Sequence, residues 1–141
     1  MMADWKWFAL GSALFAGLTT VLAKVGVEQI PSNLATLIRT VVVLAFVALL
    51  VSLRQEWPKP GQLSYRSVAF LVLSGLATGL SWLCYYRALQ RGPASLIAPL
   101  DKLSLVVAVF LAVLVLGERL TGLQWFGTFL MSVGAVLMIV K

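Results

Sequence analysis

Five apolar segments, separated by short polar connections, divide the chain. Each is close to the ~20 apolar residues that a helix needs to cross a bilayer. The two-residue alternation of a membrane β-barrel strand is missing, so the segments predict α-helices. The predicted spans cover about residues 5–27, 34–53, 67–89, 94–116 and 122–140. We therefore expect an all-α membrane protein with one five-helix domain over residues 1–141.

The connections carry turn and capping signals. Pro31 begins a turn in which Ser32 or Asn33 is expected to cap the second helix, and Thr121 is expected to cap the fifth. The N-terminus lacks the basic region and small-residue cleavage site of a signal peptide, so the first span is expected to be retained.

Composition supports the membrane interpretation. The chain is 61% hydrophobic and 11% charged, whereas soluble domains are about a quarter charged. The net charge is +6, but Lys and Arg lie at span ends, where they set topology and contact lipid phosphates, so the lipid bilayer and not nucleic acid is the expected partner. With a single Cys84 and no His, an intramolecular disulfide and the usual metal or haem sites are excluded. No catalytic motif is present, so we expect no enzyme activity, catalytic residue, metal or cofactor.

The charges at the span ends leave the orientation open. Five spans put the termini on opposite sides of the membrane. One side carries Lys6, Arg54, Lys59, Arg66 and Arg119, and the other carries Lys24, Arg87, Arg91 and Lys141. This difference is too small to fix an orientation. Either the side with the loop between the second and third spans is cytoplasmic, or both orientations insert, as dual topology.

Asp101 and Lys102 are adjacent charges inside the fourth apolar segment. A charge at bilayer depth costs a few kcal/mol or more, so such residues usually face protein or a watery cavity. Pro99, two residues earlier, cannot donate to the helix and predicts a local defect. Asp101 is too short to reach the interface and needs a partner, for which Arg39, Lys24 and Lys102 are the candidates. A functional site and a structural pair that joins two helices both fit.

Alternating span direction brings several polar groups toward one interface. Small and polar residues recur at helical spacing on the first four spans, which predicts a bundle around a polar crevice. The predicted substrate path contains Asp101, Lys102, Arg39, Lys24, Arg87, Trp82, Tyr86, Ser104 and Thr20. For Lys24, Arg39 and Arg87 the alternative is anchoring at the interface. For Trp82 and Tyr86 it is an aromatic belt.

Two pairs of glycines predict helix packing. Gly75 and Gly79 form a GxxxG motif, which permits close helix approach. Gly127 and Gly134 lie on an uncharged stripe of the fifth span, which predicts a packing or subunit face.

Several motifs together resemble the EamA domain of the drug/metabolite transporter superfamily. They are the run Phe8-Ala-Leu-Gly-Ser-Ala-Leu-Phe-Ala-Gly17, Lys24, Arg39, the run Tyr85-Tyr86-Arg87-Ala-Leu-Gln-Arg-Gly-Pro-Ala-Ser95, Pro99, Leu116-Gly-Glu118, Gly127 and Gly134. Most such transporters are similar to two fused domains with ten helices in an inverted repeat, whereas this chain resembles the single-domain branch. The resemblance implies that an antiparallel homodimer would complete the ten-helix unit.

These observations predict a secondary-active transporter, an exporter that works by alternating access in an inner membrane of bacterial type. Four cations in the predicted path, Lys24, Arg39, Arg87 and Lys102, outnumber Asp101, which favours a small anionic or zwitterionic metabolite. The alternative is a helical membrane subunit that transports nothing and partners a larger membrane protein.

Overall fold

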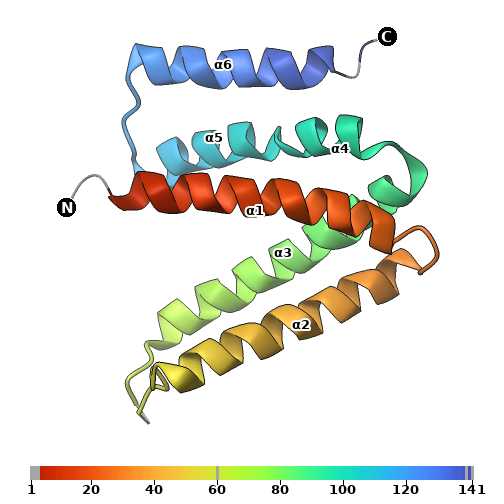
Figure 1. The fold of residues 1–141 in the computed structure, drawn as a ribbon. Helices are drawn as coiled ribbons and strands as arrows, with labels where there is room; N and C mark the ends of the chain where they lie inside the picture. The colour runs from red at the N-terminus through yellow and green to blue at the C-terminus, as the bar shows by residue number, and fades with distance from the viewer. Residues whose placement is uncertain (1–3, 60, 139, 141) are drawn as a thin grey trace. The chain divides into compact units, whose positions relative to one another are not determined.

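The computed structural model describes residues 4–59, 61–138 and 140, and the regular structure in these ranges is helical. The described helices are α1 Asp4–Gly26, α2 Ser32–Leu53, α3 Tyr65–Arg91, α4 Ala94–Asp101, α5 Ser104–Leu116 and α6 Gly122–Leu137. Figure 1 draws them in chain order from red to blue. The all-α expectation is confirmed, while Lys141, expected to add to one side's charge, lies outside the described residues.

Four helical stretches are long and apolar enough to cross a membrane: Trp5–Gly26, Ser32–Leu53, Tyr65–Arg91 and Ala94–Leu116. The shorter α6 is also apolar. Beyond its last residue, the amides of Met138 and Val140 still donate to carbonyls four residues earlier, at 3.2 and 3.3 Å. Helical hydrogen bonding therefore reaches the end of the predicted fifth span, and the helices fit a five-helix membrane bundle.

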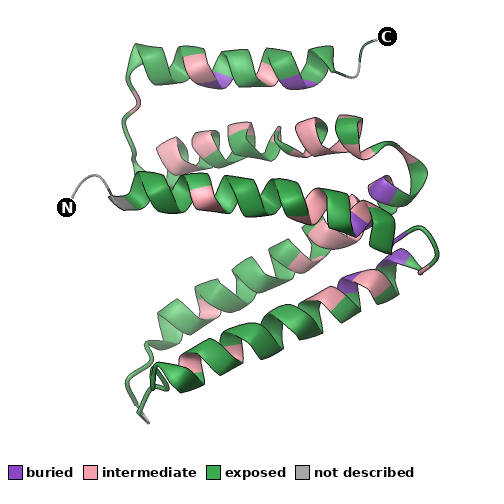
Figure 2. Ribbon diagram, in the orientation of Figure 1, coloured by how far each residue is buried: buried purple, intermediate pink, exposed green. Residues whose placement is uncertain are grey.

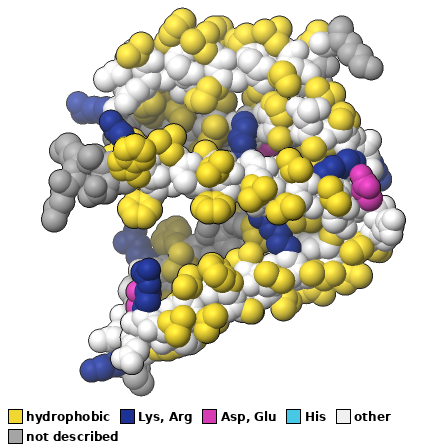
Figure 3. Space-filling model, viewed as in Figure 1, with side chains coloured by type: hydrophobic (Ala, Val, Ile, Leu, Met, Phe, Trp, Pro, Cys, Tyr) yellow, Lys and Arg dark blue, Asp and Glu magenta, His cyan; other side chains and the backbone are white. Residues whose placement is uncertain are grey.

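Large apolar side chains remain exposed along these helices. Leu14, Leu73 and Leu114 are each more than 60% exposed. Figure 3 shows hydrophobic side chains spread along the helices, with few charged groups among them. Exposing apolar surface to water costs about 25 cal/mol per Å². A bilayer removes this cost, so the exposed side chains agree with the composition.

The helix starts show one wrong prediction and one confirmed prediction. Neither Ser32 nor Asn33 caps α2; Pro31 holds the N-cap position with a ψ of 136°, and no side chain bonds there. The Pro31 carbonyl accepts from the Ala35 amide at 3.0 Å, so the helical hydrogen bonds begin at the proline. Thr121 does cap α6: its Oγ1 accepts from the Gln124 amide at 3.4 Å, and its own amide donates to Gln124 Oε1 at 2.8 Å. This reciprocal pair is a capping box.

The predicted fourth span is divided by a tight turn between α4 and α5. Pro99 has no amide hydrogen, so the Ser95 carbonyl lacks its usual α-helical donor. Four later amides donate to carbonyls only three residues back, at 3.0–3.1 Å: Lys102, Leu103, Leu105 and Val106. The turn therefore has 3₁₀ character. Residues 94–116 still form one candidate crossing, so the predicted defect is present without ending the span.

The described chain forms two compact units: one contains residues 4–20, 91–138 and 140, and the other contains residues 21–59 and 61–90. In the first, α6 packs against α4 and α5 (Figure 1). Phe110 of α5 meets Trp125 of α6 edge to face, with ring centroids 5.4 Å apart. Thr128 and Ala135 are the buried residues of α6. The predicted stripe lies elsewhere on α6, with Gly127 partly buried and Gly134 exposed.

The second unit has its buried core where the end of α1, the α1–α2 turn and the end of α3 meet (Figure 2). Val27 and Leu89 are 1% and 0% exposed. The Lys24 ammonium donates to the Leu89 carbonyl at 2.7 Å, and the Gln90 amide donates to the carbonyls of Val27 and Ile30 at 3.1 and 2.7 Å. We call these residues (Lys24, Val27, Ile30, Leu89 and Gln90) the helix-end hub. It satisfies carbonyls that a helix end and a turn would otherwise leave unpaired.

Candidate functional site

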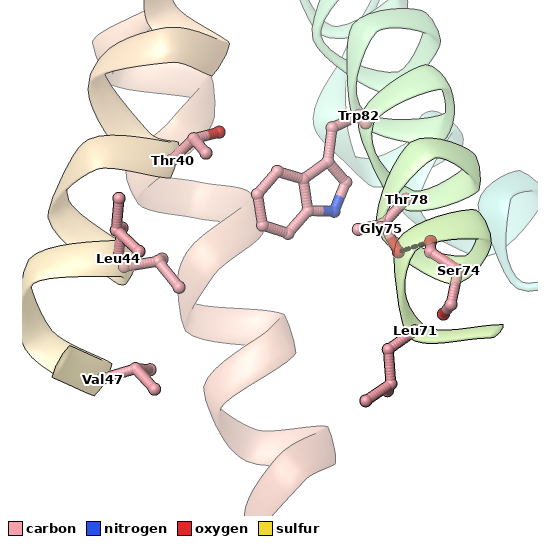
Figure 4. A pocket seen from close by; sticks show the side chains of 10 residues that line it. Thr40, Leu44, Val47, Leu71, Ser74, Gly75, Thr78 and Trp82 are labelled. Atoms are coloured by element: carbon pink, nitrogen blue, oxygen red, sulfur yellow. Dashed lines mark hydrogen bonds between the residues drawn. The ribbon is translucent and has the colours of Figure 1, made fainter. Parts of the chain in front are cut away.

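A groove of about 490 Å³ lies between α2 and α3 (Figure 4). Its lining residues recur at helical spacing, so each helix presents one face to it. From α2 they are Thr40, Val43, Leu44 and Val47, and from α3 they are Leu71, Ser74, Gly75, Thr78, Gly79 and Trp82. We call this cavity the α2–α3 groove.

The groove occupies the middle of both spans. On α2 it begins eight residues after Ser32 and ends six before Leu53. On α3 it begins six residues after Tyr65 and ends nine before Arg91. A helix rises 1.5 Å per residue, so the groove extends about 16 Å along α3. It therefore lies midway along two candidate membrane spans.

Gly75 and Gly79 give the groove its space. A Cβ at either position would meet no heavy atom within 4 Å among the described residues. No side chain of this chain packs tightly on them there, and they line the cavity instead. The same openness holds at Gly127 and Gly134. Close helix packing at these four glycines stays a prediction.

Arg39 lies at the Trp82 end of the groove, against two aromatic rings. Its guanidinium carbon is 4.3 Å from the centroid of Trp82 and 5.9 Å from that of Tyr86. Its Nη1 donates to the Tyr86 hydroxyl at 3.3 Å. These distances permit cation–π attraction, which strengthens as water is removed. We call Arg39, Trp82 and Tyr86 the arginine cluster.

The arginine cluster contains no carboxylate. In the described part of the chain the ion pairs are Arg54–Glu56 and Asp101–Lys102, at 4.0 and 3.9 Å. Arg39 is partly buried, and Tyr86 is 4% exposed. A guanidinium carries five N–H donors, and the described contacts of Arg39 use one of them. A partly buried cation with free donors is an anion receptor in chemical terms.

The other predicted path residues have different surroundings. Lys24 donates within the helix-end hub, a role the sequence did not predict. Thr20 donates its hydroxyl to the Ala16 carbonyl at 3.1 Å. Arg87 on α3 and Ser104 at the start of α5 are exposed.

Asp101 contacts Lys102, one of its three predicted partners. The two side chains are 38% and 55% exposed. The structure thus forms two groups, the arginine cluster and the Asp101–Lys102 pair. That one substrate path joins them stays a prediction.

Comparison with known proteins decides the family. The EamA-like transporter family matches residues 5–140. This chain belongs to that family. EamA membership confirms the resemblance read from the sequence motifs, and it makes the chain an integral membrane protein of a transporter family.

Two curated relatives match this chain over most of its length and most of their own. An uncharacterized transporter of a Sinorhizobium species is 51% identical over 140 residues, which cover 99% of each chain. An uncharacterized protein of Methanocaldococcus jannaschii is 27% identical over 127 residues, covering 89% of each chain. No solved structure gives a significant match.

Within this EamA chain, sequence reasoning missed Gln90, whose amide joins the end of α3 to the α1–α2 turn. Its position in the motif around Tyr85–Ser95 was the available signal. Sequence reasoning also missed that Arg39 stacks on Trp82, although both residues were predicted for the path.

Proposed function

We propose that this chain is a secondary-active exporter of a small anionic or zwitterionic metabolite, not an enzyme. The observation that carries the proposal is Arg39, a cation without a described carboxylate partner, beside a mid-span groove. Asp101 and Lys102 would add a second polar group to the path. Family membership supports transport, and the arginine cluster supports the anionic head group.

The working unit is an antiparallel homodimer in an inner membrane of bacterial type. Inverted-repeat transporters alternate by rocking one repeat against the other around a midplane site. One five-helix chain supplies half of such a unit. The near balance of Lys and Arg between the two sides of the membrane supports dual insertion, which an antiparallel pair needs.

Flux in proteoliposomes tests the transport proposal. Organic anions, zwitterions and cations of similar size would be compared in counterflow with Arg39→Gln, Asp101→Asn and the control Arg66→Gln. Arg66 is a suitable control because it also contacts an aromatic ring, Phe70, at 5.9 Å, but lies outside the groove lining. We expect anion flux to fall about tenfold or more in Arg39→Gln and to persist in Arg66→Gln. Equal flux in the two variants at matched folding would refute the site.

Topology reporters fused at each terminus test the assembly. We expect two oppositely inserted populations in similar amounts, so that each terminus is detected on either side of the membrane. We also expect a dimer after gentle solubilisation. A single orientation together with a monomer would refute the antiparallel homodimer. It would favour the alternative, a helical membrane subunit that transports nothing and partners a larger membrane protein.

A further inference from the structure

We infer that the α2–α3 groove binds a small carboxylate with an apolar body: the carboxylate on Arg39, the body along the groove, and Trp82 in contact with both. This inference rests on the proposed function and deepens it, because it names the chemical class of the substrate.

The apolar walls of the groove favour a ligand with an apolar body. Val43, Leu44, Val47 and Leu71 are apolar, and the glycines add no side chain. A volume of about 490 Å³ is within the roughly 300–1,000 Å³ of typical small-molecule pockets. A bare inorganic anion would leave most of this space to water against apolar walls. An alicyclic or aromatic body fills it and removes apolar surface from water.

Two of the three hydroxyl groups that line the groove are already bonded to backbone carbonyls. Thr40 Oγ1 donates to the Thr36 carbonyl at 2.8 Å, and Thr78 Oγ1 donates to the Ser74 carbonyl at 2.9 Å. Their hydrogens are therefore engaged within their own helices. Arg39 is the cation that contacts this groove through Trp82, a lining residue.

This charge distribution narrows the substrate class. The lining residues of the groove include no carboxylate, so a ligand ammonium would find no counter-ion there. A second ligand charge would be buried without a partner, which is costly. The groove therefore favours a monoanion over a zwitterion or a dianion.

Trp82 couples the head group to the body. Its indole ring lies under the Arg39 guanidinium and also lines the groove. The guanidinium carbon lies 4.3 Å from the ring centroid, and the described contacts use one of the five N–H donors. A carboxylate can accept two of these donors side by side without displacing the indole. Ligand binding then changes the surroundings of Trp82 both at the Arg39 guanidinium and within the groove.

Fluorescence of Trp82 tests the inference. The variant with Trp5, Trp7, Trp57 and Trp125 changed to Phe retains Trp82 alone among the five tryptophans. In phosphatidylcholine nanodiscs it would be titrated with cyclohexanecarboxylate. Matched probes are acetate, which lacks the body, cyclohexanemethanol, which lacks the charge, and cyclohexylammonium, which reverses it.

We expect a saturable response to cyclohexanecarboxylate, with each matched probe at least about tenfold weaker. Arg39→Gln is expected to reduce carboxylate binding to the level of the alcohol, while Arg66→Gln leaves it unchanged. Gly75→Leu would fill the groove without touching Arg39, since its Cβ position is open, and is expected to abolish the response. Equal binding of carboxylate and alcohol, or full binding in Arg39→Gln or Gly75→Leu, would overturn the inference.

An anionic lipid also has a charged head group and an apolar body. A separate experiment must therefore distinguish lipid binding from binding of a small carboxylate. The titration would be repeated in nanodiscs that contain phosphatidylglycerol. An unchanged response supports the small carboxylate. Loss of the response, restored by returning to phosphatidylcholine, would assign the groove to lipid and overturn the inference.

Counterflow of cyclohexanecarboxylate separates this inference from the transport proposal. Binding to Trp82 without flux of any tested anion would keep the carboxylate site and refute transport. Arg39-dependent flux of another anion without a Trp82 response would keep transport and refute this substrate class.

Discussion

Changing Arg39 and Trp82 singly and together would measure how strongly the arginine cluster holds α2 against α3. The changes are Arg39→Gln, which removes the cation, and Trp82→Leu, which removes the ring. Each single variant also alters other contacts. The double-mutant cycle isolates the pair, because contributions not shared by the two side chains cancel.

The geometry sets the expected coupling. The Arg39 guanidinium carbon is 4.3 Å from the Trp82 centroid, well within the roughly 6 Å reach of a cation–π contact. Such contacts contribute about 0.5–1 kcal/mol when exposed and about 2 kcal/mol when desolvated. Both side chains are partly buried, so we expect a coupling of about 1 kcal/mol.

Two comparison cycles make the prediction specific. Arg39→Gln with Tyr86→Phe removes a hydrogen bond of 3.3 Å, at the long end of the range, and should give about 0.5 kcal/mol. Arg66→Gln with Phe70→Leu breaks a contact of 5.9 Å to a ring that is 62% exposed. We expect this control to be close to zero.

The assay is reversible unfolding by SDS in lipid bicelles, followed by near-ultraviolet circular dichroism, with free energies compared at one SDS mole fraction. A coupling for Arg39 and Trp82 below about 0.3 kcal/mol lies within the usual additivity error and would refute a cation–π contact in the folded protein. A control coupling as large as that of Arg39 and Trp82 would refute the argument from distance and burial.

The same unfolding assay checks three further predictions. Leu89→Ala should lower the free energy of unfolding by about 2 kcal/mol or more, because Leu89 is 0% exposed; Leu80→Ala, at a position 67% exposed on the same helix, should cost much less. Thr121→Ala should cost about 0.5–2 kcal/mol by removing the capping box of α6, and Thr121→Ser should restore most of this loss. Asp101→Asn should cost less than about 1 kcal/mol, because the pair with Lys102 is long, at 3.9 Å, and neither side chain is buried; a loss of several kcal/mol would contradict this pairing as its main contact.

Hydropathy was sufficient to locate the helices, because a span needs a long apolar run whatever its neighbours are. The capping of α6 was also predictable, since Thr121 and Gln124 are three residues apart and interact locally. Capping of α2 was not: local sequence offered Ser32 and Asn33, while the helical hydrogen bonds begin at the Pro31 carbonyl. Pro99 indicated a defect, but the 3₁₀ turn that follows it depends on the backbone of several later residues.

The sequence placed Arg39, Trp82 and Tyr86 in one predicted path, but it did not predict the contacts between them. Arg39 and Tyr86 are 47 positions apart in sequence, and Lys24 and Leu89 are 65 apart. Such contacts depend on how each helix is rotated about its axis, which periodicity alone does not fix. Two cations of the same predicted crevice therefore have different surroundings: Arg39 meets aromatic rings, and Lys24 meets a backbone carbonyl.

The helix-end hub has a consequence for local opening. The last turn of a helix usually frays, and its amides are the first to exchange with solvent deuterium. Here the end of α3 holds the most buried leucine of the described chain, and the side chains of Lys24 and Gln90 bond to carbonyls at that junction. We expect amides near Leu89 to exchange more slowly than those at the C-terminal end of α2, near Leu53, which is 71% exposed. The hub thus holds closed a helix end that would otherwise be among the first to open.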